Sequence, residues 1–264
     1  MLLILFSCSK PITQVFESNS LTVKQSQNDF YFENDTIKIT YDFWSNRGVM
    51  SFTIYNKLGK PIYLDWQKSS FIYNNIKLNY WSDEEITNST QIYNSSSYRN
   101  SNNPEFLYTN GNSASTSKTI RPEKITFIPP ASYYSKKQFY LTSGSNFKMS
   151  INSESMIVPR NDNYNKNTVI YYSNYTKELS PLKFRNYLAF TMSETGSDYF
   201  FIDNDFYISS IKEMSTKHFN GPPIMIDQFG NEKYSSKFIS PNSFFKQISF
   251  DESLEFYFNQ NSQH

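Results

Sequence analysis

The sequence has few of the residues that build many catalytic and metal sites. It contains one cysteine, two histidines and seven glycines among 264 residues. A single cysteine excludes an intramolecular disulfide, a thiolate zinc site and an iron–sulfur site. A net charge of +1 provides no strong electrostatic field for attracting nucleic acid. We therefore expect no nucleic-acid partner, no metal and no other cofactor.

Aromatic residues are abundant instead, at 18% of the chain, with 24 Phe and 21 Tyr. These side chains suit the half-buried, pleated surface of a sheet, whereas alanine, the strongest helix former, is scarce. Short runs in which apolar residues alternate occur at 37–43, 49–55 and 182–192, and turn residues separate the early ones. Composition and spacing together favour an all-β protein.

The number of strands that the whole sequence predicts indicates the architecture. About seven or eight strands are expected before Met214, which predicts one immunoglobulin-like sandwich over residues 29–214. A third strand is expected to begin at residues 62–66, and Trp66 on it suits the buried tryptophan of such a sandwich. Two stretches rich in Ser, Asn and Thr, about 82–119 and 143–167, are predicted to be long loop insertions. Residues 215–264 are predicted to be a C-terminal extension that packs on the sandwich.

The first eight residues are an apolar run that ends at Cys8, with a more polar stretch beyond it. Leu5, Phe6, Ser7 and Cys8 occupy the four lipobox positions, so the segment resembles the end of a bacterial lipoprotein signal peptide. The resemblance implies cleavage before Cys8, its acylation, and attachment to a membrane of the bacterial envelope, here expected to be the outer membrane. The alternative is an apolar start whose cysteine is a buried thiol.

This resemblance divides the start of the chain in two. Residues 1–7 would be the remnant of the signal peptide. Residues 8–28 carry many Ser, Thr, Gln and Asn side chains, so they are predicted to be a lipidated flexible tether. Further along, Asp35-Thr36-Ile37 resembles the O-glycan acceptor motif of exported proteins of the Bacteroidota, which makes Thr36 a candidate modification site.

Few residues suggest catalysis. His264 is the last residue of the sequence, and His218 lies in a segment predicted to be an exposed loop. No Gly-x-Ser-x-Gly nucleophile elbow accompanies either histidine. We therefore name no catalytic residue.

Two acidic clusters are candidates for a cation site. Residues 203–205, Asp-Asn-Asp, lack the later acidic ligand of a calcium loop and are predicted to be a turn between two strands. Residues 83–85, Asp-Glu-Glu, are predicted to be solvated loop charges. Neither cluster is assigned a metal.

Trp44 and Trp81 are the candidates for stacking on sugar rings. The leading hypothesis is a non-catalytic envelope lipoprotein that acts as a binding or scaffold module for an envelope protein or a glycan. One alternative is a surface hydrolase that acts on glycans through a carboxylate pair. Another is a soluble intracellular β-protein whose first residues are merely apolar.

Overall fold

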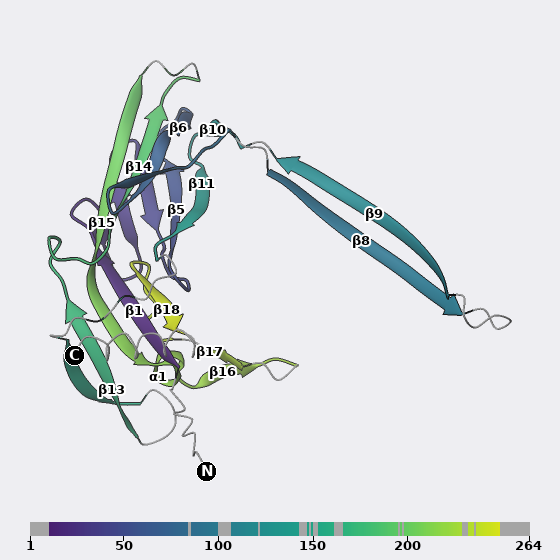
Figure 1. Ribbon diagram of the computed structural model, residues 1–264. Coiled ribbons are helices and arrows are strands. Elements are labelled where there is room, and N and C mark those ends of the chain that lie inside the picture. The colour runs from purple at the N-terminus through teal and green to yellow at the C-terminus, as the bar shows by residue number, and fades with distance from the viewer. Residues whose placement is uncertain are drawn as a thin grey trace, which may run out of the picture. The chain divides into compact units, whose positions relative to one another are not determined.

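The computed structural model describes residues 11–83, 86–99, 107–120, 122–142, 147, 149, 153–160, 166–194, 196, 198–228, 232–234 and 236–248. Cys8 lies outside them. The chain forms two compact units, one comprising residues 1–80 and 125–264 and the other residues 81–124. Apart from one short helix, the regular elements of the described residues are antiparallel strands, which confirms the all-β prediction (Figure 1).

The larger unit contains a nine-stranded sheet, sheet A. Its main path runs β10-β6-β14-β15-β1-β18 (Figure 1). In addition, β7 pairs with β6, and β13 pairs with both β12 and β15. The strand bounds are β1 Ile12–Asn19, β6 Ile62–Tyr73, β7 Ile76–Asn79, β10 Ile125–Ile128, β12 Glu154–Pro159, β13 Asn167–Asn174, β14 Lys183–Thr191, β15 Tyr199–Ser215 and β18 Ser243–Ile248.

A five-stranded sheet, sheet B, belongs to the same unit. Its order is β11-β5-β4-β3-β2, so the strands from β2 to β5 form a meander. The bounds are β2 Lys24–Gln25, β3 Phe30–Glu33, β4 Ile37–Tyr41, β5 Val49–Asn56 and β11 Tyr133–Tyr140. Along β5 buried and half-buried residues alternate, as expected for a strand with one face on a core.

Aromatic rings pack the two sheets face to face. The ring of Phe206, on β15 of sheet A, lies 4.9 Å from Tyr41, 5.3 Å from Phe43 and 5.6 Å from Phe30, measured between centroids. All four side chains are buried, and the rings meet edge to face, the arrangement that aromatic pairs favour. The larger unit is therefore sandwich-like, with a largely aromatic core.

A buried polar network also joins the two sheets. Asn186 of β14 and Asn204 of β15 both donate through Nδ2 to the hydroxyl of Tyr41 on β4, at 3.2 and 2.8 Å. The Tyr80 hydroxyl donates to Asn186 Oδ1 at 2.8 Å. Burial raises the pKa of Tyr41 and of Tyr80, so both phenols stay neutral. Each bond offsets the cost of burying the polar groups that it joins.

The segment 12–19 contradicts the predicted tether over residues 8–28. It forms β1, which pairs with β15 on one side and β18 on the other. Three of its polar residues, Thr13, Gln14 and Ser18, are buried, and distant residues supply hydrogen-bond partners: Thr13 bonds Thr216, and Ser18 donates to the carbonyl of Asn242. The flexible-tether prediction is therefore wrong for this segment.

The polar stretch 82–119, predicted to be a loop, is mostly a hairpin. Strands β8 (Ile86–Arg99) and β9 (Leu107–Ile120) pair along their whole length, from Ile86↔Ile120 to Arg99↔Leu107. The second predicted loop, 143–167, contains β12. Thr, Tyr and Ile recur in these segments, and a continuous antiparallel ladder satisfies their backbone groups despite the polar composition.

The region after β15 begins with a short helix, α1 (Thr216–Asn220), and continues into a hairpin of β16 (Pro223–Ile226) and β17 (Glu232–Tyr234). Strand β18 then completes the edge of sheet A beside β1, so part of the predicted C-terminal extension belongs to the main sheet. Phe219 of α1 joins a small apolar cluster with Val15, Ile170 and Met214. This cluster fixes α1 to the start of β1.

Candidate binding surface

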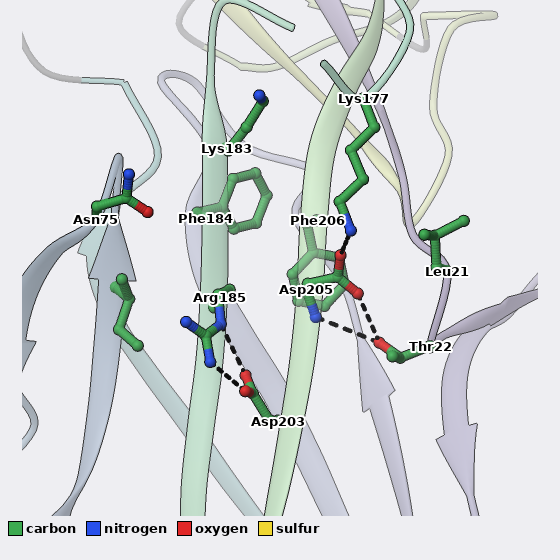
Figure 2. A pocket seen from close by; sticks show the side chains of 11 residues that line it. Leu21, Thr22, Asn75, Lys177, Lys183, Phe184, Arg185, Asp203, Asp205 and Phe206 are labelled. Atoms are coloured by element: carbon green, nitrogen blue, oxygen red, sulfur yellow. Dashed lines mark hydrogen bonds and ion pairs between the residues drawn. The ribbon is translucent and has the colours of Figure 1, made fainter.

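The outer face of sheet A carries two adjoining hollows. The first encloses about 510 Å³ between β14, β15 and the segment that follows β1 (Figure 2). The second encloses about 430 Å³ over β6, β7 and β14. Ile72, Asn75 and Arg185 line both, so the two hollows form one surface. We call this surface the outer-face groove.

Ion pairs organise the first hollow. Arg185 of β14 makes a two-pronged contact with Asp203 on the neighbouring β15, with Nε 3.0 Å from Oδ1 (Figure 2). Lys177 pairs with Asp205, which also accepts a bond from the Thr22 hydroxyl at 3.2 Å. The hydrogen bond to Asp203 raises the pKa of Arg185, so this guanidinium is a permanent cation.

The second hollow is more basic. Lys68, Lys77 and Arg185 line it together with Ser70 and Tyr187, and its lining contains no carboxylate. Among the described residues, no carboxylate lies within ion-pair distance of Lys68 or Lys77. Both lysines are exposed. This part of the groove therefore offers cationic charge to a ligand.

A row of parallel aromatic rings borders the second hollow. The ring of Tyr187 stacks on Phe201 with a centroid distance of 5.4 Å and an interplanar angle of 22°, and the ring of Tyr199 stacks on Phe201 with a centroid distance of 6.2 Å. The Lys68 ammonium sits 3.4 Å from the Tyr199 ring centroid. Since Tyr187 also lines the hollow, its ring adds an apolar surface beside the cations.

An irregularity in β6 places Lys68. The pairing of β6 with β14 shifts between Tyr187 and Ala189, and the Ser69 hydroxyl bridges the gap by donating to the Asp65 carbonyl and accepting from Ala189 N. The buried Asp65 carboxylate accepts from the backbone N–H of Lys68 at 3.2 Å and from the Tyr199 hydroxyl at 2.8 Å. Asp65 thus holds both partners of the cation–π pair.

The tryptophans have different surroundings. Trp66 is buried and its Nε1 donates to Thr126 Oγ1 at 2.8 Å, which confirms its predicted core position. Trp44 stacks on Phe219 and meets Phe245 at a tilt in the small apolar cluster, so part of its ring surface is used in packing. Trp81 belongs to the hairpin unit, where its Nε1 donates to the Pro122 carbonyl and Lys124 lies over its ring. Neither Trp44 nor Trp81 lines the groove.

Two predictions about polar residues are wrong. His218 is not exposed in a loop: it is fully buried on α1 beside the ring of Phe238. Residues 203–205 are not a turn, because β15 runs through them without a break. Asp203 and Asp205 point outward into the first hollow, whereas Asn204 points inward to Tyr41.

The lining of the groove does not include Thr36. Thr36 lies half-buried in the turn between β3 and β4, where its backbone N–H donates to Asn34 Oδ1 at 2.9 Å. Asp83 is exposed, and Glu84 and Glu85 lie outside the described residues. No cluster of His, Cys, Asp and Glu side chains suited to a metal ion occurs in the described part of the chain.

The structure is that of an all-β, sandwich-like protein with a basic and aromatic groove on the outer face of sheet A. The chain matches no protein-family model, and no curated protein or solved structure is significantly similar to it. Within the described ranges, no helix is long and apolar enough to cross a bilayer.

The sequence did not identify Arg185 and Tyr187 as groove residues, or Phe201 as their neighbour, although each lies between inward-facing neighbours on its strand, which was a usable signal.

Proposed function

We propose that the protein is a non-catalytic, lipid-anchored module of the bacterial envelope that binds an acidic glycan in the outer-face groove. The observation that carries the proposal is the second hollow. Three cations, Lys68, Lys77 and Arg185, line it together with Tyr187, and the lining contains no carboxylate. Cations attract carboxylate or phosphate groups, and an aromatic ring supports the apolar face of a sugar.

The shape of the groove favours a chain-like ligand over a compact one. Its two hollows adjoin along the face of β6, β14 and β15 and share Arg185. A ligand of several sugar units can place one acidic group near Lys77 and another near Arg185. Because these charges are exposed, salt is expected to weaken the binding.

Isothermal titration calorimetry with a uronic-acid oligosaccharide tests the proposal, with a neutral oligosaccharide of equal length as the control ligand. Binding of the acidic ligand alone is the expected result. Lys77→Gln and Tyr187→Ala are each expected to weaken it by about tenfold, a loss of roughly 1.4 kcal/mol. Lys60→Gln removes an exposed charge from a loop beside sheet B and is expected to change nothing. Equal binding of both ligands would refute the role of the cations.

The anchor part of the proposal rests on Cys8 and its lipobox-like context. Acylation supplies buried methylenes that hold a protein on a bilayer. Mass spectrometry of the mature protein tests this part: we expect a chain that begins at an acylated Cys8. Cys8→Ala is expected to move the protein from the membrane to the soluble fraction. An unmodified Met1 would instead favour the soluble intracellular alternative.

A glycan hydrolase is the second candidate function, and one observation favours it. Asp203 and Asp205 both face the first hollow, and only Asn204 separates them along β15. Arg185 and Lys177 engage these carboxylates, however, whereas a glycosidase needs one protonated acid as proton donor. Release of new reducing ends from the oligosaccharide, abolished by Asp205→Asn, would establish hydrolysis.

We also propose, as the finer fold description, an immunoglobulin-like arrangement within the sandwich. Support comes from the two facing antiparallel sheets and from Trp66 in the core. A solved structure of the chain would test the strand order against that topology.

O-glycosylation of Thr36 stays a prediction, and mass spectrometry of the peptide that contains Thr36 is the measurement that tests it.

A further inference from the structure

The β16–β17 hairpin exposes an unusual amount of apolar surface. Ile224, Met225 and Ile226 are consecutive residues of β16, with exposed fractions of 62%, 58% and 62%. Since successive side chains of a strand point to opposite faces, this strand is apolar on both faces and covered on neither. A run of this kind marks a surface that contacts a partner or a membrane.

The base of this hairpin is fixed near the start of β1. The Thr216 N–H, at the beginning of α1, donates to the Pro11 carbonyl at 3.0 Å, and the Thr13 and Thr216 hydroxyls bond at 2.9 Å. The helix ends at Gly221, whose φ of 72° turns the chain into β16. Phe219, packed in the cluster with Val15, keeps α1 in place.

Cys8 precedes Pro11 by three residues, which span at most about 11 Å when fully extended. From Thr216, five helical residues and a short link lead to Pro223. At about 1.5 Å per helical residue and about 3.5 Å per extended one, this path is under about 20 Å. A lipid on Cys8 would therefore keep its membrane close to the exposed strand β16.

A second apolar hairpin reaches the same end of sheet A. Strand β13 pairs Tyr171 with Glu213 of β15, so Val169, two residues earlier, lies level with Ser215. Val169 pairs with Ile157 of β12, and these side chains are 40% and 73% exposed. Exposed apolar residues of two separate hairpins thus gather at the end of the sheet where Pro11 lies.

We infer that β16 inserts its apolar side chains into the surface of the membrane that the lipid on Cys8 occupies; this inference rests on the proposed lipid anchor. Apolar side chains that enter the surface of the bilayer add to the attachment that acylation provides, because membrane binding strengthens with the apolar area buried. The partner of β16 is a lipid bilayer, because the distance from a lipidated Cys8 to the fixed Pro11 is too short to keep β16 far from the membrane.

A thiol-specific fluorophore on Met225→Cys tests the inference in the full, lipidated chain. The sequence has one cysteine, so acylation of Cys8 leaves residue 225 as the only free thiol. The probe is an environment-sensitive dye on protein reconstituted in phosphatidylethanolamine–phosphatidylglycerol vesicles. We expect a blue-shifted emission that lipids brominated in their acyl chains quench.

Ile76→Cys is the matched control, because Ile76 is 63% exposed and also lies on an edge strand. Strand pairing places Ile76 level with Phe206 of β15, because Ile76 pairs with Tyr73, Tyr73 with Phe184, and Phe184 with Phe206. Phe206 precedes Thr216 by ten residues, so the two lie about 33 Å apart along an extended strand. The dye at position 76 is expected to keep the emission it has in water.

The outcomes separate this inference from the anchor. One dye per chain with water-like emission at position 225 would overturn the membrane contact and leave the anchor standing. Two dyes per chain, detected by mass spectrometry, would mean that Cys8 is not acylated and would overturn both. A blue shift without vesicles that grows with protein concentration would assign β16 to a contact between two copies and also overturn the inference.

Discussion

The two faces of strands β14 and β15 differ sharply in what they do. Phe184, Asn186 and Leu188 point inward and are fully or almost fully buried against sheet B. Arg185 and Tyr187 alternate with them and line the outer-face groove. The inner face is constrained by packing and by its hydrogen-bond network. The outer face is free of that constraint, so its charges and rings can serve binding.

The sharpest test of this comparison exchanges the same residue type on the two faces. Phe206 and Phe201 both lie on β15, with exposed fractions of 1% and 49%. Phe206→Ala removes a ring from the centre of the aromatic core and is expected to lower the free energy of unfolding by about 3–5 kcal/mol. Phe201→Ala is expected to cost less than about 1.5 kcal/mol, the worth of an aromatic pair contact.

Urea denaturation monitored by far-ultraviolet circular dichroism measures both changes. Phe201→Ala should also weaken binding of the acidic oligosaccharide, because the Tyr187 ring loses its support. Equal destabilisation by the two substitutions would mean that the outer row of rings is a second core.

The buried polar network gives the next largest expected effect. Asn186→Ala removes the acceptor of the Tyr80 hydroxyl and one donor to the Tyr41 hydroxyl. Leaving these buried groups without their partner is expected to cost about 1–3 kcal/mol of unfolding free energy. Asn79→Ala, at an exposed position of β7, is the matched control and is expected to stay within about 0.5 kcal/mol of the parent. An undiminished thermal midpoint for Asn186→Ala would contradict a structural role for the network.

Alternation in the sequence predicted much of the inner face. The pattern around residues 182–192 places Phe184 and Leu188 on one side of a strand, and Trp66 was expected in the core. The prediction from alternation was wrong at Asn204, because a polar residue within a strand suggests a turn when its buried hydrogen-bond partner is unknown. That partner, Tyr41, comes from the other sheet.

Strand β1 was also missed because its partners are distant in the sequence. Gln14 and Ser18 look like tether residues, yet Gln14 bonds Glu213 and Ser18 bonds Asn242, both more than 190 positions away in sequence. The groove was equally hidden, since Arg185 meets Asp203, and Tyr187 meets Phe201, only through the register of β14 on β15. Contacts set by strand register cannot be derived from local patterns.

A pH-dependent prediction concerns a residue of β15 beyond the groove. Burial raises the pKa of Glu213 above its ordinary value of 4.5, and the bond from Gln14 only partly opposes this. A raised pKa in the folded state means that stability present below about pH 4.5 is lost as the pH rises through the folded value. Glu213→Gln should therefore unfold at a higher temperature than the parent at pH 7 and at nearly the same temperature at pH 4.

Calorimetry at the two pH values measures this difference. Glu178→Gln serves as the control, because hydrogen bonds at this exposed residue lower the pKa of its carboxylate and predict the opposite sign. A larger gain for Glu213→Gln at pH 4 than at pH 7 would contradict the burial argument.

The smallest expected change in stability belongs to the residue at the centre of the groove. Arg185→Gln breaks the ion pair with Asp203, and pairs at this level of exposure contribute about 0–1 kcal/mol. Its effect on binding should be much larger, because the guanidinium lines both hollows and its loss leaves Asp203 as an uncompensated negative charge facing the ligand. Titration calorimetry should therefore show weaker binding of the uronic-acid oligosaccharide, while the neutral control ligand is unaffected. The double variant Arg185→Gln with Asp203→Asn removes both charges and should recover part of the affinity. Unchanged affinity in the single variant would place the ligand elsewhere on the molecule.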